Sequence, residues 1–293
     1  MKKIRNYTKF LNEIINLVIP FEIKIIGYVK YEDDIYPMIQ LKHVSKAAKK
    51  NIIIMSGQHG SEFYTTHILI KWLKQFKTIE YEDFNIYIYP VINPSGYEYN
   101  IRKNIVNQET TNSEKFIKNS DIQELSILFD AIPSEIDLAL DIHGDTDEYI
   151  NKSKKTKAPG KKMVYAYERK LPQLESIAEK ALIENDNILP YIKTKTIYAS
   201  PVKHGVIDTP DHDVGIEDAM EQAGAEYTIT VELPSKCDSQ QRTAGGIAII
   251  NSILRIYKEQ NKEPIKEPIK ELSKEESIKF MQKELDDTKI EKK

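Results

Sequence analysis

Cysteine is nearly absent from the sequence, and this limits the chemistry open to the protein. Cys237 is the only cysteine among 293 residues, so the chain can form neither an internal disulfide nor a zinc site built from several cysteines. Such a composition fits a reducing compartment, and we expect a cytoplasmic protein. No apolar run approaches the roughly 18 residues that cross a membrane. We therefore expect no membrane partner.

A large excess of charge of either sign is also missing. Lys and Arg number 42 and Asp and Glu number 45, which gives a net charge of −3 at pH 7. Proteins that bind nucleic acid through its phosphates carry basic patches or a basic excess, so we expect no nucleic-acid partner. Asn12, Glu13 and Asn16 interrupt the apolar stretch near the N-terminus, which argues against a signal peptide. The apolar residues there are spaced as in an amphipathic helix.

Short apolar segments alternate with helical patterns, and this alternation predicts an α/β domain. The strand-like segments are rich in Ile, Val and Tyr and cover residues 21–29, 51–57, 85–93, 136–144, 162–168 and 227–234. The helical patterns cover residues 65–76, 120–129, 172–184 and 245–260. Nearly continuous apolar strands are typical of a sheet that is covered on both faces and is largely parallel at its centre.

The composition changes near the C-terminus, and this change sets the predicted domain boundary. Residues 1–259 would form one folded domain, and residues 260–293 a charged tail dominated by Lys and Glu. Pro264 and Pro268 oppose a helix at the start of the tail, so we expect an extended linker there. The segment 273–285 combines a capping box with helical spacing of apolar residues, and both a short helix and disorder stay open for it.

Two strand ends contain the residues best suited to bind a metal ion. His59 and Glu62 follow the apolar run 51–57, and His143 ends the run 136–144. Parallel strands present their carboxyl ends at one edge of a sheet, where α/β proteins place their sites. Imidazole nitrogens and carboxylate oxygens are ligands of catalytic zinc, which takes three protein ligands and keeps one open position. The alternatives are ordinary polar loop residues and a strand-end histidine bonded to backbone.

Two further carboxylates lie on strands that lead to this predicted metal site. Glu232 stands near the end of the otherwise apolar strand 227–234, an unfavourable place for an unpaired charge. Burial would raise its pKa toward the range of a general base, whereas a structural ion pair is the alternative. Asp141 lies two residues before His143, hence on the same side of the strand, where it could orient the ligand system.

Taken in order, these residues resemble those of the M14 (carboxypeptidase A-like) zinc carboxypeptidases. The resemblance runs from about residue 28 to residue 259. It rests on HGSE at 59–62, NPSGYEYNIR at 93–102, the strand leading to His143, and TVEL at 230–233. It implies a single α/β/α domain around a mixed, twisted sheet of about eight strands.

The same resemblance implies a role for each residue. His59, Glu62 and His143 would bind one Zn²⁺ per chain. Glu232 would act as the general base, and Arg102 would polarise the scissile carbonyl. A solvated loop arginine is the alternative for Arg102. The implied activity is zinc-dependent hydrolysis of a C-terminal peptide or amide bond.

The chain departs from the family pattern where the family clamps the terminal carboxylate of its substrate. Asn112 matches the asparagine of the family's Asn-Arg pair, but Ser113 stands in place of the arginine. A serine cannot make a bidentate ionic contact. Either Arg242 or Lys203 would have to serve, or the substrate is not an ordinary free C-terminus. The family's mobile tyrosine also has no clear match.

Glu217 occupies the position where family members that act on basic residues carry an acid. A carboxylate there would attract Lys, Arg or the side-chain amine of diaminopimelate, whereas an exposed loop glutamate is the alternative. Such a pocket is similar to that of the murein tripeptide amidases, so a peptide derived from peptidoglycan is one expected substrate. Two other functions stay open: an N-acyl amino acid deacylase of the aspartoacylase or succinylglutamate desuccinylase type, and an inactive peptide-binding relative. The sequence does not predict the oligomeric state.

Overall fold

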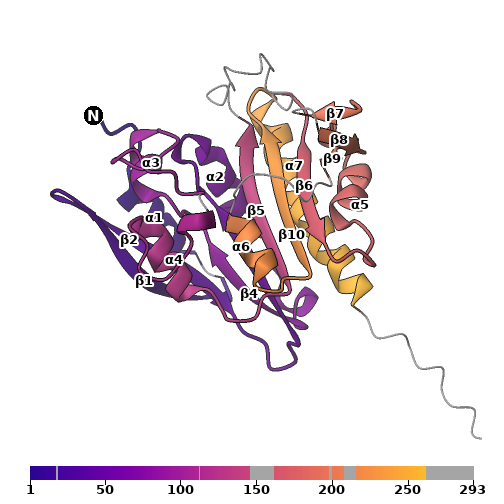
Figure 1. Cartoon of the computed structure of the whole chain (residues 1–293), viewed down its shortest axis with the longest axis horizontal. Helices are drawn as coiled ribbons and strands as arrows, with labels where there is room; N and C mark the ends of the chain where they lie inside the picture. Colours follow the sequence, from indigo (N-terminus) through magenta and orange to yellow (C-terminus); the bar gives the residue numbers. More distant parts are fainter. Residues whose placement is uncertain (18, 112, 146–161, 198–199, 208–215, 262–293) are drawn as a thin grey trace, which may run out of the picture. The chain divides into compact units, whose positions relative to one another are not determined.

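A mixed sheet forms the centre of the part of the chain that the structure describes. This structure, a computed structural model, describes residues 1–17, 19–111, 113–145, 162–197, 200–207 and 216–261. Within these residues ten strands pair in the order β1-β2-β4-β3-β5-β10-β6-β9-β8-β7 (Figure 1). The strands are β1 (Glu22–Tyr31), β2 (Asp34–His43), β3 (Lys50–Ser56), β4 (Phe84–Tyr89), β5 (Leu138–Asp145), β6 (Tyr165–Lys170), β7 (Thr196–Ile197), β8 (Ser200–Lys203), β9 (Val206–Ile207) and β10 (Tyr227–Pro234).

The direction of the strands confirms the predicted fold class. The four central strands β4, β3, β5 and β10 run parallel to their neighbours in this row. The strands β1 and β2 are antiparallel to each other, β2 is antiparallel to β4, and β6 is antiparallel to β10. The described sheet exceeds the expected eight strands because β7, β8 and β9 add short strands beyond β6.

Helices cover both faces of the sheet. They are α1 (Tyr7–Ile15), α2 (Phe63–Leu73), α3 (Pro94–Tyr99), α4 (Gln123–Ala131), α5 (Ile177–Glu184), α6 (Ile216–Gln222) and α7 (Ser239–Gln260), with short 3₁₀ turns η1 (Gly60–Glu62), η2 (Thr78–Glu80) and η3 (Ser113–Lys115). Apolar residues of α1, α2, α5 and α7 pack with one face of the central strands, and those of α4 and α6 with the other. The alternation within β3 divides its residues accordingly: Ile52 and Ile54 belong to the first cluster, Ile53 and Met55 to the second.

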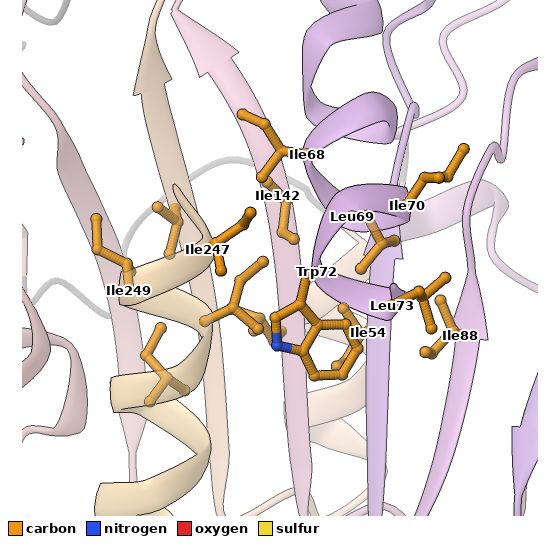
Figure 2. Packing of buried hydrophobic residues seen from close by; sticks show 14 of the residues in the cluster. Ile54, Ile68, Leu69, Ile70, Trp72, Leu73, Ile88, Ile142, Ile247 and Ile249 are labelled. Atoms are coloured by element: carbon orange, nitrogen blue, oxygen red, sulfur yellow. The ribbon is translucent and has the colours of Figure 1, made fainter. Parts of the chain in front are cut away.

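The first cluster is centred on α2 and α7. Figure 2 shows their side chains meeting over strand residues that include Ile54 and Ile142. Trp72 of α2 is almost fully buried there, and its indole Nε1 donates a 2.8 Å hydrogen bond to Asn251 Oδ1 of α7. The large apolar ring is thus removed from water without leaving its polar N–H unpaired.

Two details differ from the sequence-based expectation. The strand β2 was not predicted, although it joins the edge strand β1 to the central sheet through β4. The N-terminal helix forms as α1, with Phe10, Leu11 and Ile14 buried, but Ile15 is exposed. Ile15, the last residue of α1, therefore lies outside the apolar face of the helix.

The compact unit of the chain comprises Met1–Tyr257, and a second unit comprises Lys258–Lys293. The structure describes the second unit only as far as Asn261. The predicted tail 260–293 therefore lies outside the described residues except for its first two positions, and the boundary at 259 stays a prediction. Among the described residues, no helix has the length and apolar character needed to cross a lipid bilayer.

Candidate metal and catalytic site

Three side chains from two strand ends converge at the carboxyl edge of the sheet. The candidate ligand atoms of His59, Glu62 and His143 all lie within 4.8 Å of one another, and all three residues are buried. His59 Nδ1 lies 2.7 Å from Glu62 Oε1. His143 Nδ1 lies 3.2 Å from His59 Nδ1 and 3.2 Å from Glu62 Oε2. The structure thus brings together the three residues that the sequence nominated as ligands; their binding of a metal stays a prediction.

The geometry and charge of this cluster fit a divalent cation. His143 Nε2 lies 2.9 Å from Asp141 Oδ2, a contact that places the ring proton on Nε2 and leaves the Nδ1 lone pair for a metal. Burial acts to lower the pKa of His143, but Asp141 and Glu62 outweigh it and raise this pKa well above its usual range. The cluster therefore attracts positive charge. Two imidazoles and one carboxylate are a donor set that suits Zn²⁺.

The loop that carries His59 and Glu62 is fixed by its contact with the segment around α3. Gly57 adopts a φ of 68°, a left-handed conformation that favours glycine. A Cβ atom on Gly60 would overlap the backbone carbonyl carbon of Gly96, so only glycine allows this approach. The Asn93 N–H donates to Gly57 O at 2.9 Å, and the Gly60 N–H donates to Arg102 O at 3.3 Å. These contacts explain why glycine occupies positions 57 and 60.

The carboxyl end of β5 packs closely against α2. The Gly144 N–H, at the end of β5, donates a 2.9 Å hydrogen bond to Glu62 Oε2. This bond orients Glu62, the candidate ligand that follows the neighbouring strand β3. A Cβ atom on Gly144 would overlap the Tyr64 hydroxyl. The glycine after His143 thus permits α2 to lie against the end of β5.

Glu232 lies beside the candidate ligands, on the strand next to His143. The two residues are register partners in the parallel pair of β5 and β10. Burial raises the pKa of Glu232; the nearby Glu62 and Asp145 add to this effect, while His143 and Arg102 oppose it. A carboxylate that holds a proton more readily than an ordinary glutamate is suited to general base chemistry.

Arg102 lies at the edge of the same cluster. Its Nη1 is 3.7 Å from Glu62 Oε1, and its Nε is 3.8 Å from Glu109 Oε2. Its side chain is 26% exposed, so a positive charge reaches solvent next to the candidate ligands. The carbonyl oxygen of Arg102 accepts hydrogen bonds from Gly60 and from Asn93 Nδ2. The backbone of Arg102 is therefore tied to the loop that carries His59 and Glu62.

Two residues of the site were not nominated from the sequence. Glu109 Oε1 lies 3.4 Å from His59 Nε2, and Gln58 donates a side-chain hydrogen bond to Asp141. Glu109 belongs to an irregular loop with no periodic pattern, so nothing in the sequence signals its approach. Gln58 directly precedes His59, and that proximity is the one signal that could have found it.

The predicted substrate-binding residues are placed less completely. Asn112 lies outside the described residues, and the structure describes no side chain for Ser113 or for Glu217. The backbone of Glu217 belongs to α6, which packs with the second apolar cluster, on the face of β10 opposite Val231 and Leu233. Because side chains alternate along a strand, Glu232 extends toward that same face.

Both suggested replacements for the clamping arginine have partners elsewhere in the described chain. Lys203 Nζ pairs with Glu179 Oε2 of α5 at 3.0 Å. Arg242 Nη1 donates to the carbonyl oxygens of Pro234 and Ser235, at 3.0 and 2.9 Å. Its guanidinium also lies 4.2 Å above the ring of Tyr64, on the side of the sheet covered by α2. The suggestion that either residue replaces the clamp gains no support from these contacts.

The comparison with protein families agrees with this geometry. The model of the M14 family, zinc carboxypeptidase, matches residues 29–194. The chain belongs to the zinc carboxypeptidase family. The match includes His59, Glu62, Arg102 and His143 and ends before Glu232, so the role of Glu232 rests on its position in the structure. A sequence comparison with curated proteins gave no match.

Several solved structures share the fold of this chain. A candidate metallopeptidase from Shewanella amazonensis is 21% identical, with a TM-score of 0.67 over 85% of this chain and 91% of the other. A metallo-carboxypeptidase from Pseudomonas aeruginosa, in complex with (2-guanidinoethylmercapto)succinic acid, is 14% identical, with a TM-score of 0.57 over 86% and 68%. A succinylglutamate desuccinylase from Silicibacter is 14% identical, with a TM-score of 0.54 over 81% and 67%.

Proposed function

We propose that this protein is a zinc-dependent metallocarboxypeptidase or amidase that hydrolyses a C-terminal peptide or amide bond. One observation carries the proposal: His59, Glu62 and His143 converge, and Glu232 is the register partner of His143 on the adjoining strand. A hydrolase of this kind needs a cation site and a proton acceptor side by side. Membership of the zinc carboxypeptidase family supports the same reaction class.

Each side chain has a defined part in the proposed reaction. The three ligands would hold one Zn²⁺ per chain, which supplies Lewis-acid chemistry toward the scissile carbonyl and toward water. Glu232 accepts a proton from the attacking water and returns it to the leaving nitrogen. Arg102 stabilises the negative charge that develops on the carbonyl oxygen, because its guanidinium lies within 4 Å of Glu62 at the edge of the cluster.

The proposed substrate is a peptide that ends in a basic residue or in diaminopimelate, as in a fragment of peptidoglycan. Support comes from the place of Glu217 in the chain, as the second residue of α6, the helix on the face toward which Glu232 extends. The related Pseudomonas aeruginosa enzyme binds a compound with a guanidino group, like that of arginine. We further propose that the protein acts in the cytoplasm, in keeping with its single cysteine.

A second reaction, deacylation of N-acyl amino acids, is favoured by one departure from the family pattern. Ser113 stands where the clamping arginine is expected, while Arg242 hydrogen-bonds backbone carbonyls and Lys203 pairs with Glu179. An acyl amino acid presents a different arrangement of carboxylates from a peptide C-terminus. An inactive peptide-binding relative is the remaining alternative, and it would have no need for Glu232 beside the ligands.

A substrate panel separates these functions. Zinc-loaded protein is incubated with peptides ending in Lys, Arg or diaminopimelate, each with a free and with an amidated terminus, and with N-succinyl and N-acetyl amino acids. The proposal expects release of the terminal residue from at least one peptide, and no release by Glu232→Gln. Turnover of the acyl amino acids alone would assign the deacylase function. Binding of a peptide with equal affinity by both proteins, without turnover by either, would assign the inactive relative.

A further inference from the structure

Gln58 occupies a fully enclosed position between the two strand ends that carry the candidate ligands. It is 1% exposed. Its Nε2 donates a hydrogen bond to Asp141 Oδ2 on β5, and its backbone carbonyl accepts a 2.6 Å hydrogen bond from Thr110 Oγ1. Because Gln58 directly precedes His59, this one residue connects the loop after β3 with β5 and with the loop that contains Glu109.

Asp141, the acceptor of this hydrogen bond, has 0% of its surface exposed. It lies on the strand between β3 and β10, where its register partners are Met55 and Thr230. The single oxygen Oδ2 accepts from both Gln58 Nε2 and His143 Nε2. A buried carboxylate is costly unless donors compensate it, and two donors in fixed positions also fix its rotation.

We propose that Gln58 is a positioning residue that holds Asp141 and, through it, the ring of His143 in the orientation that binds the metal. The proposal rests on the proposed function, because it assumes that His143 is a metal ligand. The direction of the His143 Nε2–H bond follows the fixed Asp141 oxygen, and this leaves Nδ1 directed at His59 Nδ1, 3.2 Å away. The hydrogen-bond partners of ligating histidines tune metal affinity in this way.

A role limited to filling space does not account for the amide. Gln58 Oε1 is buried and makes no hydrogen bond with the described residues. An unpaired buried carbonyl oxygen destabilises the folded state, and an apolar side chain of similar size would avoid this loss. The unpaired amide oxygen of Gln58 therefore destabilises the folded state, and the hydrogen bond from Nε2 to Asp141 offsets this loss.

Zinc affinity tests this role, with Gln58→Met compared with the wild type. Methionine keeps the length and most of the volume of glutamine but donates no hydrogen bond. Gln40→Met is the matched control, because Gln40 is also buried and donates from Nε2 to the Tyr89 hydroxyl at 2.8 Å, in a contact that does not involve the metal site. We expect zinc affinity to fall on the order of tenfold to a hundredfold in Gln58→Met and to stay unchanged in Gln40→Met.

Two further readouts separate positioning from general loss of stability. The visible spectrum of the cobalt-substituted protein, which reports ligand geometry, should change in Gln58→Met and not in Gln40→Met. In a double-mutant cycle, Gln58→Met should cost little further zinc affinity in an Asp141→Asn background, because both residues act through one contact. If Gln58→Met does not fold, Gln58→Asn, whose amide is one methylene too short to keep the contact, takes its place.

The outcomes distinguish this inference from the proposed function. If the wild type binds no zinc, both the proposed function and this inference are wrong. A wild type that binds zinc tightly, together with a Gln58→Met or Gln58→Asn variant of equal affinity and unchanged cobalt spectrum, would overturn the positioning role alone. Loss of affinity in Gln40→Met equal to that in Gln58→Met would also overturn it, since stability would then explain both.

Discussion

His143 and Glu232 are register partners on the adjacent parallel strands β5 and β10. Paired residues on neighbouring strands extend to the same face of a sheet, so the backbone hydrogen bonds of the sheet set the spacing between candidate ligand and candidate base. Loops do not have to close to bring the two together. A site built on strands is held more rigidly than one built on loops, and this favours a preorganised hydrolytic centre.

Replacing Glu232 with Gln should abolish turnover and leave metal binding intact. The amide keeps the size of the carboxylate but cannot accept the proton from water, and general base catalysis contributes on the order of 10²–10⁴ in rate. The measurement is kcat/KM on the best substrate of the panel, with zinc content determined on the same samples. Glu184→Gln, on the exposed end of α5, serves as the control. Full turnover in Glu232→Gln would exclude this residue as the base.

Replacing His143 with Ala should remove the metal. We expect about one zinc per chain in the wild type and far less in the variant after dialysis, because two ligands from one loop hold the ion poorly. His67→Ala is a suitable control: this histidine lies in the helix that follows the ligand loop, but its Nε2 contacts the Tyr97 hydroxyl at 3.3 Å. Equal zinc content in all three proteins would show that the two strand ends do not form one site.

The sequence was sufficient to predict which strand ends meet. Apolar runs bounded by turns identified β3, β5 and β10, and the rule that parallel strands end at one edge placed His59, Glu62 and His143 together. The strand β2 was missed because Pro37, which cannot donate to a ladder, lies within it. Pro37 is accommodated in the antiparallel pair with β1, where it is the register partner of Tyr28.

The contacts between loops could not be predicted in the same way. Single side-chain contacts between segments far apart in the chain bring three residues to the site: Gln58, Thr110 and Glu109. No period or spacing within one segment reports such a contact. The same holds for Arg242, which the sequence offered as a substitute clamp and whose guanidinium instead hydrogen-bonds the carbonyl oxygens of Pro234, the last residue of β10, and of Ser235.

Replacing Gly60 with Ala should destabilise the protein and weaken zinc binding. The added Cβ would overlap the Gly96 backbone, which cannot move without disturbing α3 and the carbonyl of Arg102 that accepts from Gly60. We expect a loss of about 1–3 kcal/mol or more in the free energy of unfolding. Ser61→Ala changes the next residue of the same turn but should cost within about 0.5 kcal/mol, because Ser61 Oγ is buried without a hydrogen bond among the described residues. Urea unfolding of both variants measures the difference; equal stabilities would contradict the close approach of the two glycines.

Replacing Glu168 with Gln should change how stability depends on pH. Glu168 is buried on β6, and its Oε1 accepts from the backbone N–H groups of Ile177 and Ala178, at 2.8 and 2.9 Å, at the start of α5. Burial raises the pKa of Glu168, although these donors and Ser176 oppose the effect. A folded-state pKa above the unfolded one gives stability that is present below the unfolded pKa and is lost as pH rises through the folded pKa.

Glutamine keeps the acceptor but cannot ionise, so it escapes this loss. The free energy of unfolding of Glu168→Gln, relative to the wild type, should therefore rise as the pH increases from 4.5, the ordinary pKa of a glutamate, through the raised folded-state pKa of Glu168. Each tenfold difference between the folded and unfolded ionisation constants contributes about 1.4 kcal/mol. Urea unfolding of both proteins freed of metal by a chelator measures it, since bound zinc would add a pH dependence of its own. A constant difference between the two proteins across this range would show that the helix start fully compensates the buried charge.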